Sequence, residues 1–273
     1  MREDLTGTPI AAYQLSPSGP ARGDVVLCHG TPWSSRVWLP VAQRLARDHR
    51  VWLWDMPGYG QSIMDPAYPV DLVRQGRRFA GLLRNWGVRR PHVVAHDIGG
   101  AVALGAHLLG GADFASLFLL DVVTLEPWGS PFFSLVAEHD DVFARLPPAL
   151  HAALVVEYIA GASNHRLDAE RTAELAAPWL TEAGRPAFYR QIAQLRPADT
   201  RPLAERLGEV RCRTGIGWGA EDPWIDVEQA FRLHAAIPGS TAPVIFDGLG
   251  HLAPMEDPDA VATAIRHWLS AQG

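Results

Sequence analysis

The sequence predicts an α/β protein built on a doubly wound parallel sheet, and three patterns lead to this prediction. Short runs of continuously apolar residues recur along the chain, which is typical of strands buried on both faces. Stretches with apolar residues spaced three and four apart, typical of helices, alternate with these runs. Turn-forming or polar clusters follow the runs, such as His29-Gly30-Thr31-Pro32 after Val25–Cys28. This alternation favours a parallel sheet covered by helices.

The same patterns give each element its place in the chain. We expect strands at Val25–Cys28, Val51–Trp54, His92–Ala95, Leu117–Asp121, Cys212–Trp218 and Val244–Phe246. We expect helices at Val37–Arg47, Leu72–Trp86, Ala101–Leu109, Val227–Ala236 and Asp259–Leu269. Each expected strand ends close to a turn signal, so the polar side chains after the strands should gather at one edge of the sheet.

One long segment interrupts the alternation. From about Glu126 to Leu207 the periodicity is helical and no convincing strand occurs. Because this is too long for one crossover, we interpret it as an insertion. We therefore predict a core domain of residues 1–125 and 208–273 and a helical cap domain of residues 126–207. Ligands of open α/β sheets bind beyond the carboxyl ends of the strands, so the cap should act as a lid over the site.

Composition excludes several classes of function. The 273 residues are 48% hydrophobic and carry 24 basic and 30 acidic side chains, a net charge of −6 without basic clusters. Nucleic acid is therefore not an expected partner. The first residues lack a signal-peptide pattern, and the longest apolar stretch, Val102–Leu120, is interrupted by His107 and Asp113. We expect a soluble, cytoplasmic protein, a monomer or homodimer, with no membrane partner.

Neither cysteines nor histidines indicate a cofactor. Cys28 and Cys212 each lie in an apolar strand-like run, so we interpret both as buried hydrophobic residues. The 11 histidines form no His-Glu-x-x-His motif, and no paired Cys-x-x-Cys occurs. We expect no metal site and no cofactor.

The most informative stretch is Val94-Ala95-His96-Asp97-Ile98-Gly99-Gly100, where an expected strand runs directly into an expected helix. Asp97 lies between the small residues Ala95 and Gly99. This arrangement resembles the nucleophile elbow of the α/β-hydrolase family, usually G-x-S-x-G, with Asp in place of Ser. The structural alternative for an aspartate here is that it caps the N-terminus of the helix.

Other residues occur in the order that the family uses, nucleophile, acid and histidine. Asp222 follows the strand that ends at Trp218, and His251 follows the last strand. Asp121, at the end of the strand before the insertion, occupies the position from which some dehalogenases of the family take their acid. The resemblance therefore implies a catalytic set of Asp97, Asp222 and His251, with Asp121 as the alternative acid.

The resemblance also implies a role for each group. A carboxylate can displace a leaving group from an sp³ carbon and form an alkyl ester on the enzyme. His251 would then activate the water that attacks the Asp97 carbonyl carbon, while the second carboxylate orients the imidazole. By resemblance, the backbone N–H groups of Thr31 and Ile98 form the oxyanion hole.

Two types of leaving group fit an aspartate nucleophile. Opening an epoxide requires a hydroxyl donor, and family members that do so commonly use two lid tyrosines. The segment Gly184-Arg185-Pro186-Ala187-Phe188-Tyr189-Arg190-Gln191 resembles the lid segment that carries one of them, and Tyr158 is the other tyrosine of the insertion. We therefore expect an epoxide hydrolase whose partner is a small-molecule substrate of low polarity.

The first alternative is a haloalkane or haloacetate dehalogenase, which needs N–H donors for the halide. By resemblance, Thr31 replaces a halide-binding Asn, and Ile98 replaces the Trp or Arg that follows the nucleophile in such enzymes. Trp33, Trp128 or Trp179 could supply an indole N–H instead. The second alternative is a non-catalytic member of the fold that only binds a ligand.

Overall fold

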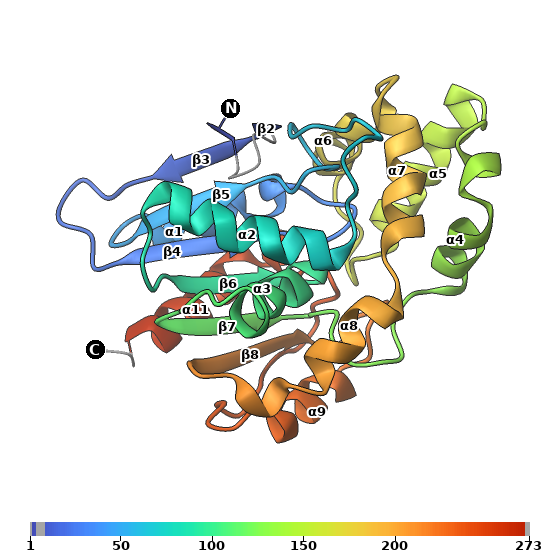
Figure 1. The fold of residues 1–273 in the computed structure, drawn as a ribbon. Coiled ribbons are helices and arrows are strands. Elements are labelled where there is room, and N and C mark those ends of the chain that lie inside the picture. Colours follow the sequence, from blue (N-terminus) through green and yellow to red (C-terminus); the bar gives the residue numbers. More distant parts are fainter. Residues whose placement is uncertain (1, 4–8, 271–273) are drawn as a thin grey trace.

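The computed structural model describes residues 2–3 and 9–270, and its central feature is a seven-stranded sheet (Figure 1). The strand order is β3-β5-β4-β6-β7-β8-β9. The edge strand β3 is antiparallel to β5, and the other neighbours are parallel. The strands are β3 (Ala12–Leu15), β4 (Asp24–Cys28), β5 (Arg50–Trp54), β6 (His92–His96), β7 (Ser116–Leu120), β8 (Arg213–Gly219) and β9 (Val244–Phe246). This confirms the predicted mostly parallel sheet.

The central strands are buried on both faces, as their continuous apolar runs predict. All of β7 is buried, and so are the last four residues of β4 and β6. Helices α2 (Leu72–Trp86) and α3 (Ile98–Leu108) pack together on one face. Helices α1 (Leu39–Leu45) and α11 (Pro258–Ser270) pack together on the other (Figure 1). The sheet is thus the middle layer of three.

Residues 126–207 form helices and no strand, all within the part of the chain that the structure describes. They contain α4 (Pro131–Phe143), α5 (Pro148–Ala160), α6 (Ala169–Ala176), the 3₁₀ helix η2 (Ala177–Leu180), α7 (Gly184–Gln194) and α8 (Pro197–Ala204). Figure 1 shows α4 to α7 beside one end of the sheet, next to the turn where β6 leads into α3. The domain boundaries at residues 126 and 207 stay a prediction.

Several short elements complete the described chain. A two-residue ladder pairs β1 (Arg2–Glu3) with β2 (Pro9–Ile10). The 3₁₀ helix η1 (Ser35–Trp38) precedes α1, and η3 (Leu207–Glu209) precedes β8. Helices α9 (Glu228–Ala236) and α10 (Ala253–Glu256) flank β9 in the sequence. Helix α3 begins three residues earlier than predicted, directly after Asp97, so the turn is tighter than the sequence pattern suggested.

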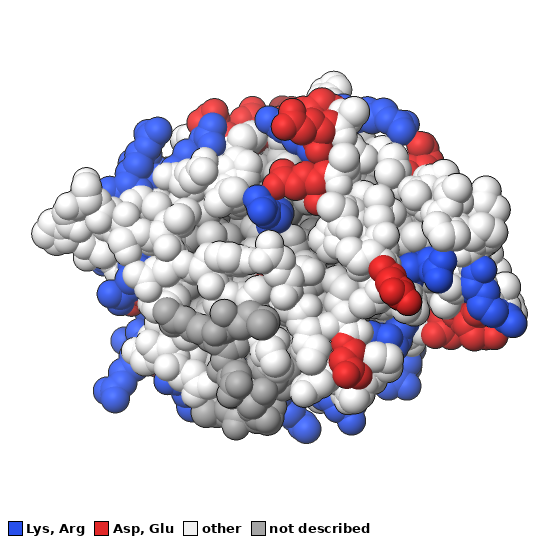
Figure 2. All heavy atoms as spheres, turned by 90° about the horizontal axis from the view of Figure 1, so that it is seen from above, with Lys and Arg blue, Asp and Glu red and all other residues white. Residues whose placement is uncertain are grey.

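The face of the molecule seen in Figure 2 has no single dominant charge. On the face shown in Figure 2, acidic and basic side chains are interspersed around a mostly uncharged surface. Within the described ranges, every helix falls short of the length and apolarity needed to cross a membrane.

The contact between α3 and β4 depends on Gly99. A Cβ atom at this position would lie 2.6 Å from the carbonyl oxygen of His29 and 2.7 Å from that of Cys28. Backbone atoms cannot move away as a flexible side chain can, so α3 approaches β4 this closely only because residue 99 has no side chain.

We expect Gly99→Ala to lower the free energy of unfolding by about 1–3 kcal/mol, the usual cost of overpacking a core. Gly208→Ala is the matched control, because an added Cβ there meets nothing within 4 Å, and it should change the free energy by less than about 0.5 kcal/mol. Urea denaturation measures both. Equal stability of the two variants would show that the close approach at residue 99 does not constrain the fold.

Candidate active site

Asp97 occupies a strained turn between β6 and α3. Its φ of 51° and ψ of −127° lie in a region that residues other than glycine rarely adopt. It stands at the N-cap position of α3, but its side chain makes no capping hydrogen bond to that helix. Instead, the Thr31 amide donates to Asp97 Oδ2 at 2.6 Å. The carboxylate is thus not the simple helix cap that its position allows.

The loop after β4 lies against Asp97 because it contains Gly30. A Cβ atom on Gly30 would collide with the Asp97 side chain. His29 fixes the same loop: its Nδ1 lies 2.8 Å from the Gly30 oxygen, and its Nε2 accepts from the Met56 amide at 2.9 Å. The ring of His29 is therefore engaged by the backbone on both sides. This leaves the Thr31 amide directed at Asp97.

His251 lies between two carboxylates. Its Nδ1 lies 2.8 Å from Asp222 Oδ2, and its Nε2 lies 4.0 Å from Asp97 Oδ1. Both the imidazole and the Asp222 carboxylate are fully buried. Asp222 Oδ1 in turn accepts from the amides of Trp224 and Ile225, which fixes the orientation of the carboxylate. The fold thus brings together Asp97, Asp222 and His251, the three side chains that the sequence analysis grouped although they are far apart in the chain.

Asp121 lies close to this set but has a different partner. Its Oδ1 accepts from the Gly219 amide at 2.7 Å, and its Oδ2 has no hydrogen-bond partner among the described residues. Burial, together with the negative charge of Asp222, raises the pKa of Asp121 well above its usual range. Of the two acids that the sequence left open, Asp222 is the one hydrogen-bonded to His251.

Burial and charge shift the pKa of both facing groups. Burial raises the pKa of Asp97 to about 7, although the His251 charge and the Thr31 amide act against this shift. Burial alone would lower the pKa of His251, but the charge and hydrogen bond of Asp222, followed by the charges of Asp97 and Asp121, raise it to about 9. At neutral pH the imidazole is therefore protonated, and Asp97 is poised between its two forms.

A small cavity of about 40 Å³ opens beside Asp97. It is far smaller than the several hundred cubic ångströms of sites for drug-sized ligands. The described residues that line it include no Lys or Arg: Thr31, Asp97, Ile98, Val123, Trp128, Gly129, Ser130, Phe133, Tyr158, Trp224 and Ile225. Aromatic side chains thus form much of its wall, and Asp97 is its only charged residue among those described.

The two predicted lid tyrosines have different surroundings. Tyr158, on α5, lines the cavity, and its pKa is raised by burial and by the Asp97 charge. Tyr189, on α7, does not line it. The Tyr189 hydroxyl lies 2.8 Å from His151 Nδ1, and the other nitrogen of that ring binds the Trp179 carbonyl. Of the two tyrosines that the sequence offered as leaving-group donors, only Tyr158 thus lies beside Asp97, because this side of α7 packs against α4 and α5.

The three tryptophans weighed as halide donors also differ. The Trp128 indole N–H donates to Thr200 at 3.0 Å, and that of Trp179 donates to the Pro32 carbonyl at 2.7 Å. Trp33 is buried and stacks on Trp224 with 5.7 Å between ring centroids. Its Nε1 has no hydrogen-bond partner in the described chain, but Trp33 does not line the cavity.

Sequence reasoning missed two residues near Asp97. The Trp224 ring stacks on Tyr158 at 4.7 Å and lies 5.1 Å from the ring of His251. Gln191, two residues after Tyr189 on α7, accepts hydrogen bonds from the hydroxyls of Thr31 and Tyr59. The segment that suggested Tyr189 also contained Gln191. Residues two apart on a helix point in different directions, so Gln191 faces the core whereas Tyr189 faces its neighbouring helices.

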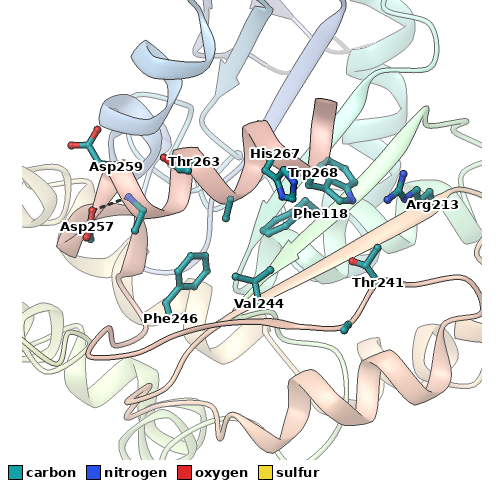
Figure 3. Close-up of a pocket in the computed structure, with 13 residues that line it drawn as sticks. Phe118, Arg213, Thr241, Val244, Phe246, Asp257, Asp259, Thr263, His267 and Trp268 are labelled. Atoms are coloured by element: carbon teal, nitrogen blue, oxygen red, sulfur yellow. Dashed lines mark hydrogen bonds between the residues drawn. The ribbon is translucent and has the colours of Figure 1, made fainter. Parts of the chain in front are cut away.

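A larger groove of about 830 Å³ lies elsewhere, between α11 and the edge strand β9 (Figure 3). Its labelled apolar residues are Phe118, Val244, Phe246 and Trp268, with Asp257 and Asp259 toward one end and Arg213 toward the other. None of the predicted site residues lines this groove. Its size therefore does not make it the reactive site.

Nothing in the described part of the chain groups three or more His, Cys, Asp or Glu residues in a way that could hold a metal ion. Both cysteines are buried and free. Burial raises the pKa of Cys28 to about 12 and that of Cys212 to about 11, which disfavours the reactive thiolate.

Comparison with known proteins establishes the family. Residues 25–264 match the model of the alpha/beta hydrolase family. The chain belongs to this family. A crystal structure of an alpha/beta hydrolase fold protein from Burkholderia ambifaria is 41% identical, with a TM-score of 0.90 over 97% of this chain and 96% of that one. The chain is thus a hydrolase of α/β fold.

Two further proteins that the chain resembles are more distant. A 2-hydroxy-6-oxo-2,4-heptadienoate hydrolase of Pseudomonas putida is 26% identical, covering 92% of this chain and 91% of the relative. A haloalkane dehalogenase variant from Bradyrhizobium elkanii has a TM-score of 0.77 over 99% of this chain and 95% of that one, at 18% identity. This last similarity shows the fold alone.

The hydrogen bond between His251 and Asp222 generates an electrostatic prediction. Asp222→Asn should lower the pKa of His251 from about 9 toward its ordinary value of 6.5, because the charge that faces Nδ1 is lost. Asp121→Asn should lower it less, since Asp121 makes no hydrogen bond to the ring. NMR titration of the histidine rings measures both, with His251→Gln assigning the signal. A larger shift in Asp121→Asn would contradict this assignment.

Proposed function

We propose that this hydrolase acts through an alkyl-enzyme ester on Asp97, with an epoxide as its substrate. The observation that carries the proposal is the different environment of the two Asp97 oxygens. Oδ2 accepts from the Thr31 amide, whereas Oδ1 faces His251 Nε2 at 4.0 Å. One oxygen is therefore held by a donor, and the other is available to attack carbon.

In the first step, Oδ1 attacks one carbon of the epoxide, and the C–O bond of the ring breaks as the ester bond forms. The ring oxygen becomes an alkoxide and takes a proton from the Tyr158 hydroxyl, which lines the same cavity. Oδ2 becomes the carbonyl oxygen of the ester. It already lies against the Thr31 amide, which with the Ile98 amide would stabilise the later oxyanion.

In the second step, His251 accepts a proton from water as that water adds to Cγ of Asp97. Esterification removes the negative charge of Asp97, one of the charges that hold the pKa of His251 near 9. The imidazole therefore becomes able to lose its proton and act as a base. Asp222 keeps the ring oriented and stabilises the imidazolium. Collapse of the tetrahedral intermediate breaks the bond between Cγ and the alkyl oxygen, which takes a proton from the His251 imidazolium to give the diol. The Asp97 carboxyl, now with one oxygen from water, returns its proton to His251. The proton that His251 lost before water attacked restores the Tyr158 hydroxyl, which ring opening had left as a phenolate.

The cavity limits the substrate. At about 40 Å³, with aromatic walls and no Lys or Arg among the described lining residues, it suits a neutral molecule of few non-hydrogen atoms. A carboxylate-bearing substrate would place a second negative charge beside Asp97 without a cationic side chain to balance it. A short-chain neutral epoxide is therefore the substrate class that the site favours.

Dehalogenation of a neutral haloalkane is the second candidate. The observation in its favour is the buried indole N–H of Trp33, which has no hydrogen-bond partner among the described residues and lies on Trp224 at the edge of the site. An unpaired buried N–H is a donor that an anion could use. Both candidates share the ester on Asp97 and differ in the atom that leaves.

Trapping of the ester tests the chemistry. We expect His251→Gln to accumulate a covalent adduct, because the base for ester hydrolysis is missing. Intact-protein mass spectrometry after incubation with short-chain epoxides should show a mass gain equal to the whole epoxide. After incubation with haloalkanes, a mass gain equal to the substrate less hydrogen halide would favour the second candidate. The control is Asp97→Ala/His251→Gln, which should gain nothing. Absence of any adduct, with an inactive wild type, would favour a protein that only binds ligands.

The tyrosines test the leaving group. Tyr158→Phe should slow epoxide opening by about 100-fold or more, the usual contribution of a positioned general acid. Tyr189→Phe is the matched control and should stay close to the wild type, because that hydroxyl binds His151. Single-turnover rates of ester formation measure both effects. Equal losses in the two variants, or no loss in Tyr158→Phe, would contradict the assigned donor.

A further inference from the structure

We propose that Gln191 is a positioning residue for Asp97, an inference that rests on the proposed function. The side-chain carbonyl of Gln191 fixes the Thr31 hydroxyl. It thereby also fixes the Thr31 amide, which holds the Asp97 carboxylate. Gln191 lies on α7, in the helical segment, whereas Thr31 lies in the loop after β4. In this proposal the helical segment of residues 126–207 has a second role besides covering the cavity. It sets the geometry of the oxyanion hole.

Two hydroxyl groups converge on the same atom of Gln191. The Thr31 hydroxyl donates to Oε1 at 2.8 Å, and the Tyr59 hydroxyl donates to Oε1 at 2.8 Å. All three side chains are buried. Both lone pairs of Oε1 are thereby used, which defines the orientation of the amide group and holds it between two loops of the core.

Thr31 transmits this constraint to Asp97. Its hydroxyl binds Gln191, and its own amide donates to Asp97 Oδ2 at 2.6 Å. A second contact from the helical segment holds the next residue of the loop, because the Trp179 indole donates to the Pro32 carbonyl at 2.7 Å. The segment that carries the oxyanion-hole amide is thus restrained by hydrogen bonds on consecutive residues.

The negative charges of the site explain why position 191 carries an amide and not a carboxylate. A glutamate could accept the same two hydroxyl hydrogens without leaving an N–H unpaired, whereas Gln191 Nε2 has no hydrogen-bond partner in the described ranges. However, Asp97, Asp121 and Asp222 already lie close together in the interior. Another negative charge would oppose ionisation of Asp97, so a neutral acceptor is required.

The electrostatics of neighbouring groups agree with this geometry. The Thr31 amide is one of the groups that lower the pKa of Asp97 against the effect of burial, which raises it to about 7. Burial raises the pKa of Tyr59, and the Asp97 charge raises it further. The cluster around Gln191 Oε1 therefore lies within electrostatic reach of Asp97, and a charge placed there would act on the carboxylate.

The test compares two glutamines of α7. Gln191→Leu removes the acceptor, and Gln191→Glu keeps it but adds a charge. Gln194→Leu is the matched control, because Gln194 also joins α7 to the core, by accepting from the Val70 amide at 2.8 Å, but it contacts neither Thr31 nor Tyr59. Titration of Asp97 by NMR of ¹³C-labelled aspartate, assigned with Asp97→Asn, reads the effect without any substrate.

We expect Gln191→Leu to raise the pKa of Asp97 and Gln191→Glu to raise it further, while Gln194→Leu matches the wild type. On a substrate that alkylates Asp97, Gln191→Leu should lower kcat about 10-fold with KM changed less than about 2-fold, since the contact stabilises the oxyanion and not the bound substrate. In Gln191→Glu the acid limb of the pH–rate profile should move to higher pH.

An unchanged Asp97 titration in both Gln191 variants would overturn the proposal, and so would the same kcat in Gln191→Leu and Gln194→Leu. Thr31→Val removes the same hydrogen bond from the other side and replaces Gln191→Leu if that variant does not fold. Failure of the proposed function has a separate signature. In that case no substrate alkylates Asp97 in the wild type, yet the Asp97 titration still decides whether Gln191 controls the carboxylate.

Discussion

The backbone of Asp97 is the constraint around which the site is built. Its positive φ turns the chain sharply from β6 into α3, and this directs the side chain away from its own helix toward the Thr31 amide. The turn is accommodated because the neighbouring backbone carries glycine at the points of closest approach, Gly30 and Gly99. Strain at one residue is thus maintained by tight packing around it.

Burial then determines the chemistry of the groups that meet there. Asp97 keeps a pKa of about 7 in an interior that disfavours its charge, because an imidazolium and a backbone amide oppose that penalty. The imidazolium in turn depends on Asp222. Each charge is stabilised by the next, so neutralising Asp97 by alkylation changes the basicity of His251. In the proposed mechanism, this coupling separates the step that needs a nucleophile from the step that needs a base.

The sequence predicted the core better than the helical segment, for a physical reason. Continuous apolar runs specify strands buried on both faces, and parallel strands bring the residues after them to one edge, so Asp97, Asp222 and His251 were placed correctly relative to one another. The edge strand β3 was missed because it is short and only partly buried. The direction of Tyr189 depends on how α7 is rotated against its neighbours, which packing decides and no motif encodes. The same rotation places Gln191 against Thr31.

The most direct measurement of the central claim follows the oxygen of the hydrolytic water. If the ester forms on Asp97 and water attacks its carbonyl carbon, repeated turnover in H₂¹⁸O should place ¹⁸O in the Asp97 carboxylate, which mass spectrometry of the peptide that contains Asp97 detects. In a single turnover the product should instead carry an unlabelled oxygen from the enzyme. Label in the product of the first turnover, with none in Asp97, would show that water attacks the substrate directly and would contradict an ester intermediate on Asp97.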